Sequence, residues 1–429
     1  MRRFGLLPAF LAALTVPEMP ASAAARGSVA TRAGALVELL NGKPGAQPQF
    51  APSFLAQVPQ AQVTAIASQL LAQMGAVKGV AAIRMEGADA ASVDFAYAKG
   101  TVTMRMVVEA SPPHLVTGLL VTATKVDGDS FAALSNELRA MPGASGLAVM
   151  RLDGALPTTI SEFNGGKFLA IGSAIKLYIL AELMRAIEAR EKSWDTVVPL
   201  TSRSLPSGIM QDWPKASPVT LHTLAALMIS QSDNSATDTL IDALGRGKVE
   251  SMLAAAGHSD PARNMPFLTT GEAFLLKGRG GAALLSKWIA GDAAARRAML
   301  VELGKIDRAR FDYGSFTGPP RAIDAVEWFA TPQDMARVLD WIRRNDARTG
   351  GKAGEILAIN RGIGAAAGDY RYVGYKGGSE AGVISLNYLV QAKTGAWYAV
   401  SGSWNDPKSA VEELKFANLI SRAVALAAK

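Results

Sequence analysis

The chain of 429 residues contains no cysteine and only three histidines, His114, His222 and His258. The absence of cysteine excludes disulfides, cysteine nucleophiles, iron–sulfur clusters and thiolate zinc sites. The histidines are far apart in the sequence, and no pair has the spacing of a metal-binding helix. We therefore expect no metal centre and no cofactor.

The sequence also lacks a basic run of roughly five to eight residues and any alternation of basic with aromatic residues, although its formal net charge is +7. This pattern predicts a small-molecule substrate as partner and no nucleic acid. No apolar stretch is long enough to span a bilayer. With 49% apolar residues, the chain is expected to form a packed core, and its length predicts two or three domains.

Residues 1–25 have the features of a secretory signal. Arg2 and Arg3 precede an apolar run over 4–16, and small residues follow at 21–25. This order of charge, apolar core and small residues is typical of a cleaved signal peptide. The alternative is an ordinary buried helix. The signal interpretation predicts an exported protein, either periplasmic or secreted.

Residues 26–127 are predicted to form a small α+β domain. Apolar periodicity predicts two helices, Thr31–Leu40 and Gln60–Met74. Alternating stretches predict four strands, Val80–Met85, Ser92–Ala98, Thr101–Glu109 and Leu115–Thr124. Helices followed by an antiparallel meander are typical of an α+β unit, and no motif in it carries chemistry.

Residues 128–429 are predicted to form an α/β sandwich, with an antiparallel sheet assembled from both ends of the segment and helices inserted between them. Strands are predicted at Leu147–Leu152, Thr158–Phe163, Tyr372–Lys376, Gly382–Val390 and Trp397–Ser403. Helices are predicted at Phe131–Ala140 and Ser409–Ala428, with long helical stretches in between.

The first candidate site is Ser173-Ala174-Ile175-Lys176, which follows Gly172 and precedes an apolar run. In a helix that begins here, Ser173 lies at the positive end of the helix dipole, where a backbone N–H stabilises an oxyanion. Lys176 lies one turn further on the same face, and burial would favour its neutral amine. The alternative is that Ser173 only caps the helix and Lys176 is a surface lysine.

Two further motifs follow. Ser232-Asp233-Asn234 separates two apolar helices, and it could be no more than a capped turn. Lys376-Gly377-Gly378-Ser379 ends a predicted strand, where glycines allow a ligand to approach the backbone closely. Lys376 supplies a positive charge, and the Ser379 N–H is a candidate second oxyanion donor.

Together and in this order, the three motifs resemble those of the penicillin-recognising serine hydrolases, which include class A β-lactamases and DD-peptidases. The resemblance implies a β-lactamase/transpeptidase fold and acyl transfer. Ser173, Lys176 and Ser232 are the implied catalytic residues, and Asn234, Lys376, Gly378 and Ser379 the implied substrate-binding residues. A small α+β domain before such a fold is similar to a subgroup related to proteins of clavulanic-acid clusters. For that subgroup the resemblance implies a steroid-isomerase or nuclear transport factor 2-like cone, and esterase activity beside weak lactamase activity.

The sequence departs from the family pattern at Gly377, where the family has threonine or serine. A hydroxyl that helps to hold a substrate carboxylate is therefore missing. A literal Lys393-Thr394-Gly395 occurs further on, but it lies between two predicted strands, and we interpret it as a hairpin turn.

The sequence leaves two roles open for Glu272, activation of the deacylating water or helix capping. Glu272, in Thr269-Thr270-Gly271-Glu272, is a candidate general base by resemblance to the Glu-x-x-Leu-Asn motif of class A β-lactamases, but Thr269-x-x-Glu272 is also a helix capping box. The expected function is a serine hydrolase acting on a β-lactam or an ester. The alternative is a penicillin-binding sensor that stays acylated.

Overall fold

The computed structural model describes residues 23–43, 49–278, 281–306, 318–362 and 370–428. The predicted signal core lies outside these residues, and the expected cleavage region at 23–25 coincides with the start of the first helix.

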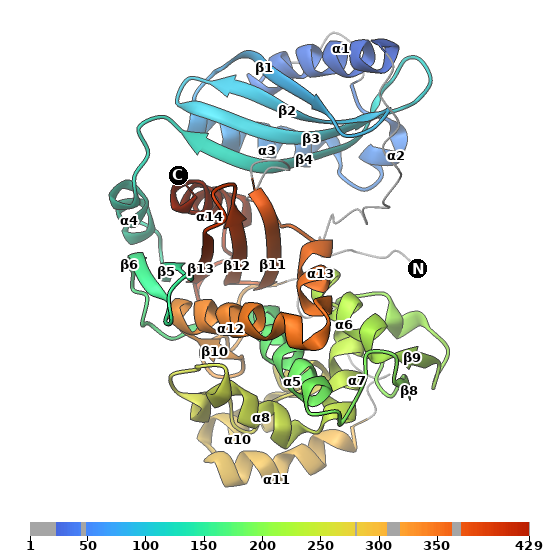
Figure 1. Cartoon of the computed structure of the whole chain (residues 1–429), viewed down its shortest axis with the longest axis vertical. Coiled ribbons are helices and arrows are strands. Elements are labelled where there is room, and N and C mark those ends of the chain that lie inside the picture. Colours follow the sequence, from blue (N-terminus) through green and yellow to red (C-terminus); the bar gives the residue numbers. More distant parts are fainter. Residues whose placement is uncertain (1–22, 44–48, 279–280, 307–317, 363–369, 429) are drawn as a thin grey trace.

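The N-terminal unit is a four-stranded antiparallel meander in the order β1-β2-β3-β4, drawn at the top of Figure 1 with α1 above it. Its elements are α1 (Ala23–Leu40), α2 (Pro52–Leu55), α3 (Gln60–Met74), β1 (Val77–Met85), β2 (Ala90–Tyr97), β3 (Gly100–Val108) and β4 (Val116–Val126). Alternate residues of β2 face the helices: Ala91, Val93 and Phe95 are fully buried there. The unit therefore has a core of its own.

The remainder of the described chain is an α/β sandwich around a five-stranded antiparallel sheet, in the order β11-β12-β13-β5-β6. Its strands are β5 (Ala144–Arg151), β6 (Thr158–Phe163), β11 (Tyr370–Glu380), β12 (Val383–Ala392) and β13 (Trp397–Asn405). Two short antiparallel pairs join β7 (Leu169–Ala170) to β10 (Phe329–Ala330) and β8 (Val197–Pro199) to β9 (Pro218–Thr220). The sheet thus combines both ends of the segment, as predicted.

Helices cover both faces of this sheet. The helices and 3-10 turns are α4 (Phe131–Arg139), η1 (Gly172–Ile175), α5 (Lys176–Glu188), η2 (Met210–Asp212), α6 (Leu221–Ser230), α7 (Asn234–Leu244), α8 (Arg246–Ala255), η3 (Pro261–Asn264), α9 (Thr270–Lys277), α10 (Ala282–Ala290), α11 (Ala293–Gly304), α12 (Pro332–Asn345), η7 (Asp346–Thr349), α13 (Lys352–Ile359) and α14 (Glu413–Ala427). One face packs on α4 and α14, and the other on α12 and the helical region.

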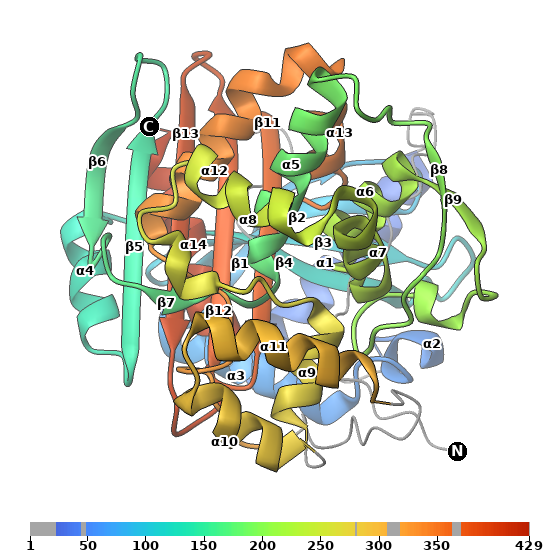
Figure 2. The same ribbon diagram turned by 90° about the horizontal axis from the view of Figure 1, so that it is seen from below.

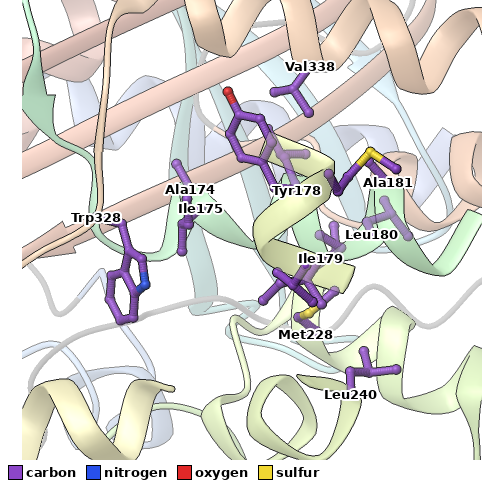
Figure 3. Packing of buried hydrophobic residues seen from close by; sticks show 14 of the residues in the cluster. Ala174, Ile175, Tyr178, Ile179, Leu180, Ala181, Met228, Leu240, Trp328 and Val338 are labelled. Atoms are coloured by element: carbon purple, nitrogen blue, oxygen red, sulfur yellow. The ribbon is translucent and has the colours of Figure 1, made fainter. Parts of the chain in front are cut away.

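Helix α5 is the central element of the helical region. Figure 2 shows it surrounded by α6, α7, α8 and α12. Nearly all of its residues are buried, and Figure 3 shows Tyr178, Ile179 and Leu180 packed with Met228 of α6 and Leu240 of α7. A helix buried on nearly all sides is held by close packing, so the start of α5 is rigidly placed.

Helix α14 connects the two units. It packs on β12 and β13 and also contacts β4 of the N-terminal unit (Figure 1). The Thr124 N–H donates to the Ser421 hydroxyl at 3.0 Å, and the Thr124 hydroxyl donates to Asn418 at 3.1 Å. The Arg422 guanidinium donates two hydrogen bonds to Asp129 and two to Glu137, at 2.7 to 3.0 Å. The N-terminal unit is therefore fixed to α14, the last helix.

Three predicted bounds differ from the structure by four residues or more. Strand β11 runs on to Glu380 and does not end at Lys376, because positions 376 to 380 remain paired with β12. The terminal helix begins at Glu413, four residues after the predicted Ser409. The first helix begins at Ala23 and not at Thr31.

Candidate active site

Ser173 lies in the 3-10 turn η1, directly before α5, and its side chain is partly exposed. The residue that caps α5 is Ile175, without a side-chain hydrogen bond. Lys176, the first residue of α5, is fully buried. The alternative of a capping serine beside a surface lysine is therefore wrong on both points.

Strand β11 lies against η1. A Cβ at position 378 would collide with the Ile171 carbonyl and with the backbone nitrogens of Ser173 and Ala174, so only glycine permits this approach. Gly172 has φ near +50° and faces the Ser379 backbone. Two segments that are far apart in the sequence thus meet, and the Ser173 and Ser379 backbones become neighbours.

The Ser379 side chain has a different environment from its backbone. Its hydroxyl donates a hydrogen bond to Glu413, in the first turn of α14. Because side chains alternate along a strand, Ser379 points to the α14 face, whereas Lys376 and Gly378 belong to the face toward η1. Only the Ser379 N–H is then available to a ligand at Ser173.

Ser232 bridges the two buried lysines of the site. The Lys176 amine donates to the Ser232 hydroxyl at 3.1 Å and to its carbonyl at 2.7 Å. The Lys376 amine donates to the same hydroxyl at 3.1 Å. Ser232 has φ near +55°, a left-handed conformation that costs a non-glycine residue about 1–3 kcal/mol and is often found at functional sites. A hydroxyl that accepts two N–H bonds keeps its own proton to donate.

The electrostatics of the two amines follow from burial. Burial lowers the pKa of Lys176 to about 7, although the charges of Asp233 and Asp238 oppose this. Burial and the neighbouring Lys176 hold the pKa of Lys376 well below its usual value. Neither lysine forms a salt bridge with a carboxylate among the described residues. A large share of Lys176 is therefore a neutral amine near pH 7, the form that accepts a proton.

Asn234 is 2% exposed and its side chain is engaged by the protein. Its Oδ1 accepts from Lys176 at 2.8 Å, and its Nδ2 donates to the Leu205 carbonyl at 3.4 Å. The expected contact to a substrate amide would compete with these bonds. In the described part of the chain, no hydrogen bond joins Lys176 to the Ser173 hydroxyl, because the amine is directed to Ser232 and Asn234.

Asp233 caps α7, as the capped-turn alternative predicted, and it also has a role that the sequence did not reveal. Its carboxylate caps α7 by accepting the Ala236 N–H at 2.8 Å, and also accepts the N–H groups of Ile209 and Met210 at 2.7 and 2.9 Å. Gly208, with φ near +109°, packs where a Cβ would collide with Asp233. One carboxylate therefore holds the loop around Gly208 on the helix that begins at Asn234.

Asp238 lies further along α7, and no pattern in the sequence indicates its role. Its carboxylate accepts four hydrogen bonds: from the Ser204 hydroxyl at 2.6 Å, from the Thr270 N–H and hydroxyl at 2.7 and 2.8 Å, and from the Gly271 N–H at 2.9 Å. Burial raises the pKa of Asp238, and these bonds oppose the shift. The start of α9 is thus attached to the helix that carries Asn234.

Glu272 is confirmed as a capping residue. The Thr269 hydroxyl accepts the Glu272 N–H at 3.2 Å, and the Glu272 carboxylate accepts the Thr269 N–H at 2.8 Å. The same carboxylate forms a bidentate ion pair with Arg246, with N–O distances of 2.8 and 2.9 Å. Both of its oxygens are occupied, so it is not free to activate a water.

The glycine at position 377 also has a physical reason. A Cβ there would collide with the hydroxyl of Tyr375, which lies two residues earlier on the same face of β11. The Tyr375 ring packs against Tyr388 of β12 in a tilted arrangement, with ring centroids 4.8 Å apart. An aromatic side chain therefore occupies the space of the missing hydroxyl. The interpretation of Lys393-Thr394-Gly395 as a turn is confirmed, since these residues join β12 to β13 and Gly395 has φ near +98°.

The described ranges contain no group of three or more histidine or acidic side chains arranged to hold a metal ion. No helix within those ranges combines the length and apolarity that crossing a bilayer would need.

The model of the beta-lactamase enzyme family matches residues 131–427. The chain is similar in structure to a beta-lactamase from Chitinophaga pinensis, with 18% identity, a TM-score of 0.50, and coverage of 70% of this chain and 100% of the other. A beta-lactamase from Sphaerobacter thermophilus gives 20% identity, a TM-score of 0.49 and coverages of 70% and 98%. A structure of PBP-A gives 16%, 0.48, and coverages of 69% and 94%. No curated protein sequence matches the chain.

Proposed function

The chain belongs to the beta-lactamase enzyme family, and on that premise we propose that it is a serine hydrolase in which Ser173 forms an acyl-enzyme with a β-lactam or an ester. The observation that carries the proposal is the Ser232 hydroxyl, held 3.1 Å from each of two buried lysine amines beside η1. Buried amines with lowered pKa values, next to a partly exposed serine, are what general-base activation of a hydroxyl needs.

In the acylation step, the Ser173 hydroxyl oxygen attacks the carbonyl carbon, and its proton goes to the neutral Lys176 amine. Catalytic hydrogen bonds are often formed only with substrate bound, so the amine would turn from Ser232 to Ser173 at this stage. The Ser173 and Ser379 N–H groups stabilise the oxyanion. The bond to the leaving nitrogen or oxygen then breaks, Ser232 donates its proton to the leaving group, and a lysine ammonium replaces that proton. Lys376 keeps Ser232 in place.

In the deacylation step, a water adds to the acyl carbonyl and gives its proton to Lys176, after which the Ser173 oxygen leaves and regains a proton. Lys176 has this role in our proposal because the Glu272 carboxylate is committed to Thr269 and Arg246. The same commitment favours a second candidate function, a binding protein that is acylated by β-lactams and releases them very slowly.

The test is incubation with a chromogenic cephalosporin and with a short-chain aryl ester, followed by product release and by intact mass, with Ser173→Ala as control. Steady release that is absent in the control supports the hydrolase. One stoichiometric burst with a lasting mass increment supports the acylated binding protein. Neither release nor a mass increment would contradict both.

We also propose that residues 1–25 are an export signal and that 26–127 and 128–429 are separate domains. The separate hydrophobic core of the N-terminal unit supports the division. The charge and apolar pattern before Ala23 supports export to the periplasm or medium. The N-terminal sequence of the protein recovered from a cell envelope fraction tests the signal, and cleavage near residues 23–25 is expected.

A further inference from the structure

A second cluster of buried charges lies at the end of β11. The Lys277 amine donates to Glu327 at 2.6 Å and to Glu380 at 2.5 Å. The three side chains are 2%, 4% and 17% exposed, respectively. They come from the last residue of α9, the segment before β10 and the last residue of β11. One ammonium thus joins three segments that are far apart in the sequence.

The cluster is adjacent to the proposed oxyanion site. Glu380 directly follows Ser379, and it alternates with Lys376 and Gly378 on the face of β11 that meets η1. Beyond Glu380 the chain turns back at once into β12 through Gly382, which has φ near +80°. The end of β11 is therefore fixed on the side of η1 by the contact of Glu380 with Lys277.

The charges of the cluster do not balance, since one cation serves two carboxylates. Burial and the like charge of Glu327 raise the pKa of Glu380 to about 8, although Lys277 opposes this. Val383, the residue of β12 that pairs with Glu380, carries no charge. Below this pH the cluster contains a proton on Glu380, and above it two carboxylates repel each other around one ammonium.

We propose that Lys277, Glu327 and Glu380 form a positioning clamp that fixes the Ser379 backbone next to Ser173 and so sets the rate of acylation. The clamp rests on the proposed function, because the position of the Ser379 N–H matters only if it stabilises the reacting carbonyl. An oxyanion donor acts over a short distance, so a small displacement of β11 is enough to lower the rate. Lys277 acts through Ser379 and does not touch the substrate.

The experiment is the pH profile of acylation by a short-chain aryl ester, between pH 6.5 and about 9.5, in the full-length protein. For the unmodified protein we expect a descending limb centred near pH 8, with about a tenfold loss at pH 9, because a group with a pKa of about 8 is then roughly one-tenth protonated. In Glu380→Gln, which mimics the protonated carboxyl, the limb is expected to disappear. Ser173→Ala supplies the background hydrolysis to be subtracted.

Glu327→Gln is the second variant, and it keeps the proposal testable if Glu380→Gln fails to fold. It leaves one carboxylate for one ammonium, so the doubly charged state cannot form and the limb is again expected to disappear. Asp340→Asn is the matched control, because Asp340 is 4% exposed and pairs with Arg343 and Arg344 of its own helix, α12. It should lower the Tm and leave the limb unchanged.

A purely structural role for the clamp would change the Tm and leave the pH profile unaltered. A limb that persists near pH 8 in either folded glutamine variant would overturn the clamp while Ser173 remains acylated, so the proposed function would stand. Absence of any acylation of Ser173 in the unmodified protein would overturn both.

Discussion

Replacement of Lys176 by methionine tests the electrostatics of the site most sharply. Lys176 is fully buried, and burial lowers its pKa from 10.5 to about 7. Between these two values the folded protein holds a neutral amine, whereas the unfolded chain holds an ammonium. The unfolded state binds more protons, so the free energy of unfolding rises with pH in this window.

The magnitude follows from linkage. A shift from 10.5 to about 7 makes the folded state about 4 kcal/mol less stable at pH 7 and about 2 kcal/mol less stable at pH 9 than it would be with an unperturbed lysine. The unmodified protein should therefore gain about 2 kcal/mol over this range from Lys176 alone. Lys176→Met removes this gain. At pH 7 the variant also loses the hydrogen bonds to Ser232 and Asn234, at about 1–3 kcal/mol for each acceptor left unpaired, so its net change there is small.

Urea unfolding at pH 7, 8 and 9 measures the effect, with Lys408→Met as the matched control at an exposed lysine. We expect the free energy of unfolding of the control to depend on pH as that of the unmodified protein does. At pH 9, the free energy of unfolding of Lys176→Met should be about 2 kcal/mol lower than that of the unmodified protein. Parallel curves for all three proteins would refute the lowered pKa and, with it, the neutral base. Activity of Lys176→Met should be lost at every pH.

Three further substitutions have definite expected outcomes. Glu272→Gln weakens the ion pair with Arg246 and should cost about 1 kcal/mol of stability in urea unfolding, without accumulation of an acyl-enzyme in rapid-quench mass spectra; accumulation would restore the general-base role. Gly208→Ala should cost about 1–3 kcal/mol, because a Cβ collides with Asp233, and an unchanged Tm would contradict the packing of that loop. Arg422→Met leaves the Asp129 carboxylate, 4% exposed, without its charged partner and should cost about 3 kcal/mol, which calorimetry detects; no change would mean that this ion pair does not hold α14 to the segment after β4.

The fold and the main site were accessible from the sequence because their signals are local. The sheet was predicted from alternating stretches at both ends of the segment. Ser173 and Lys176, one helical turn apart, formed a recognisable pair before a buried helix. The order of the motifs then indicated which distant segments meet. Glycine at position 378 was consistent with close approach, and the structure supplies the reason, a backbone contact with Ser173.

The remaining features depend on contacts between distant residues that no local pattern contains. Lys277, Glu327 and Glu380 each resemble ordinary surface charges in the sequence, and only the fold buries them together. The Asp233 carboxylate was interpreted as part of a motif or a cap, yet it also holds the loop around Gly208. Strand β11 extends through its glycines because its pairing with β12 continues there, a tertiary effect that outweighs the low strand propensity of glycine.

In the proposed function, Ser173 becomes covalently acylated. The most direct measurement is the mass of the protein quenched in acid within seconds of mixing with a slowly released β-lactam, followed by mapping of the modified peptide. We predict a mass increment equal to one β-lactam on the peptide that contains Ser173, and none in Ser173→Ala. An increment on another residue, or an unmodified protein that nevertheless turns over substrate, would contradict the account.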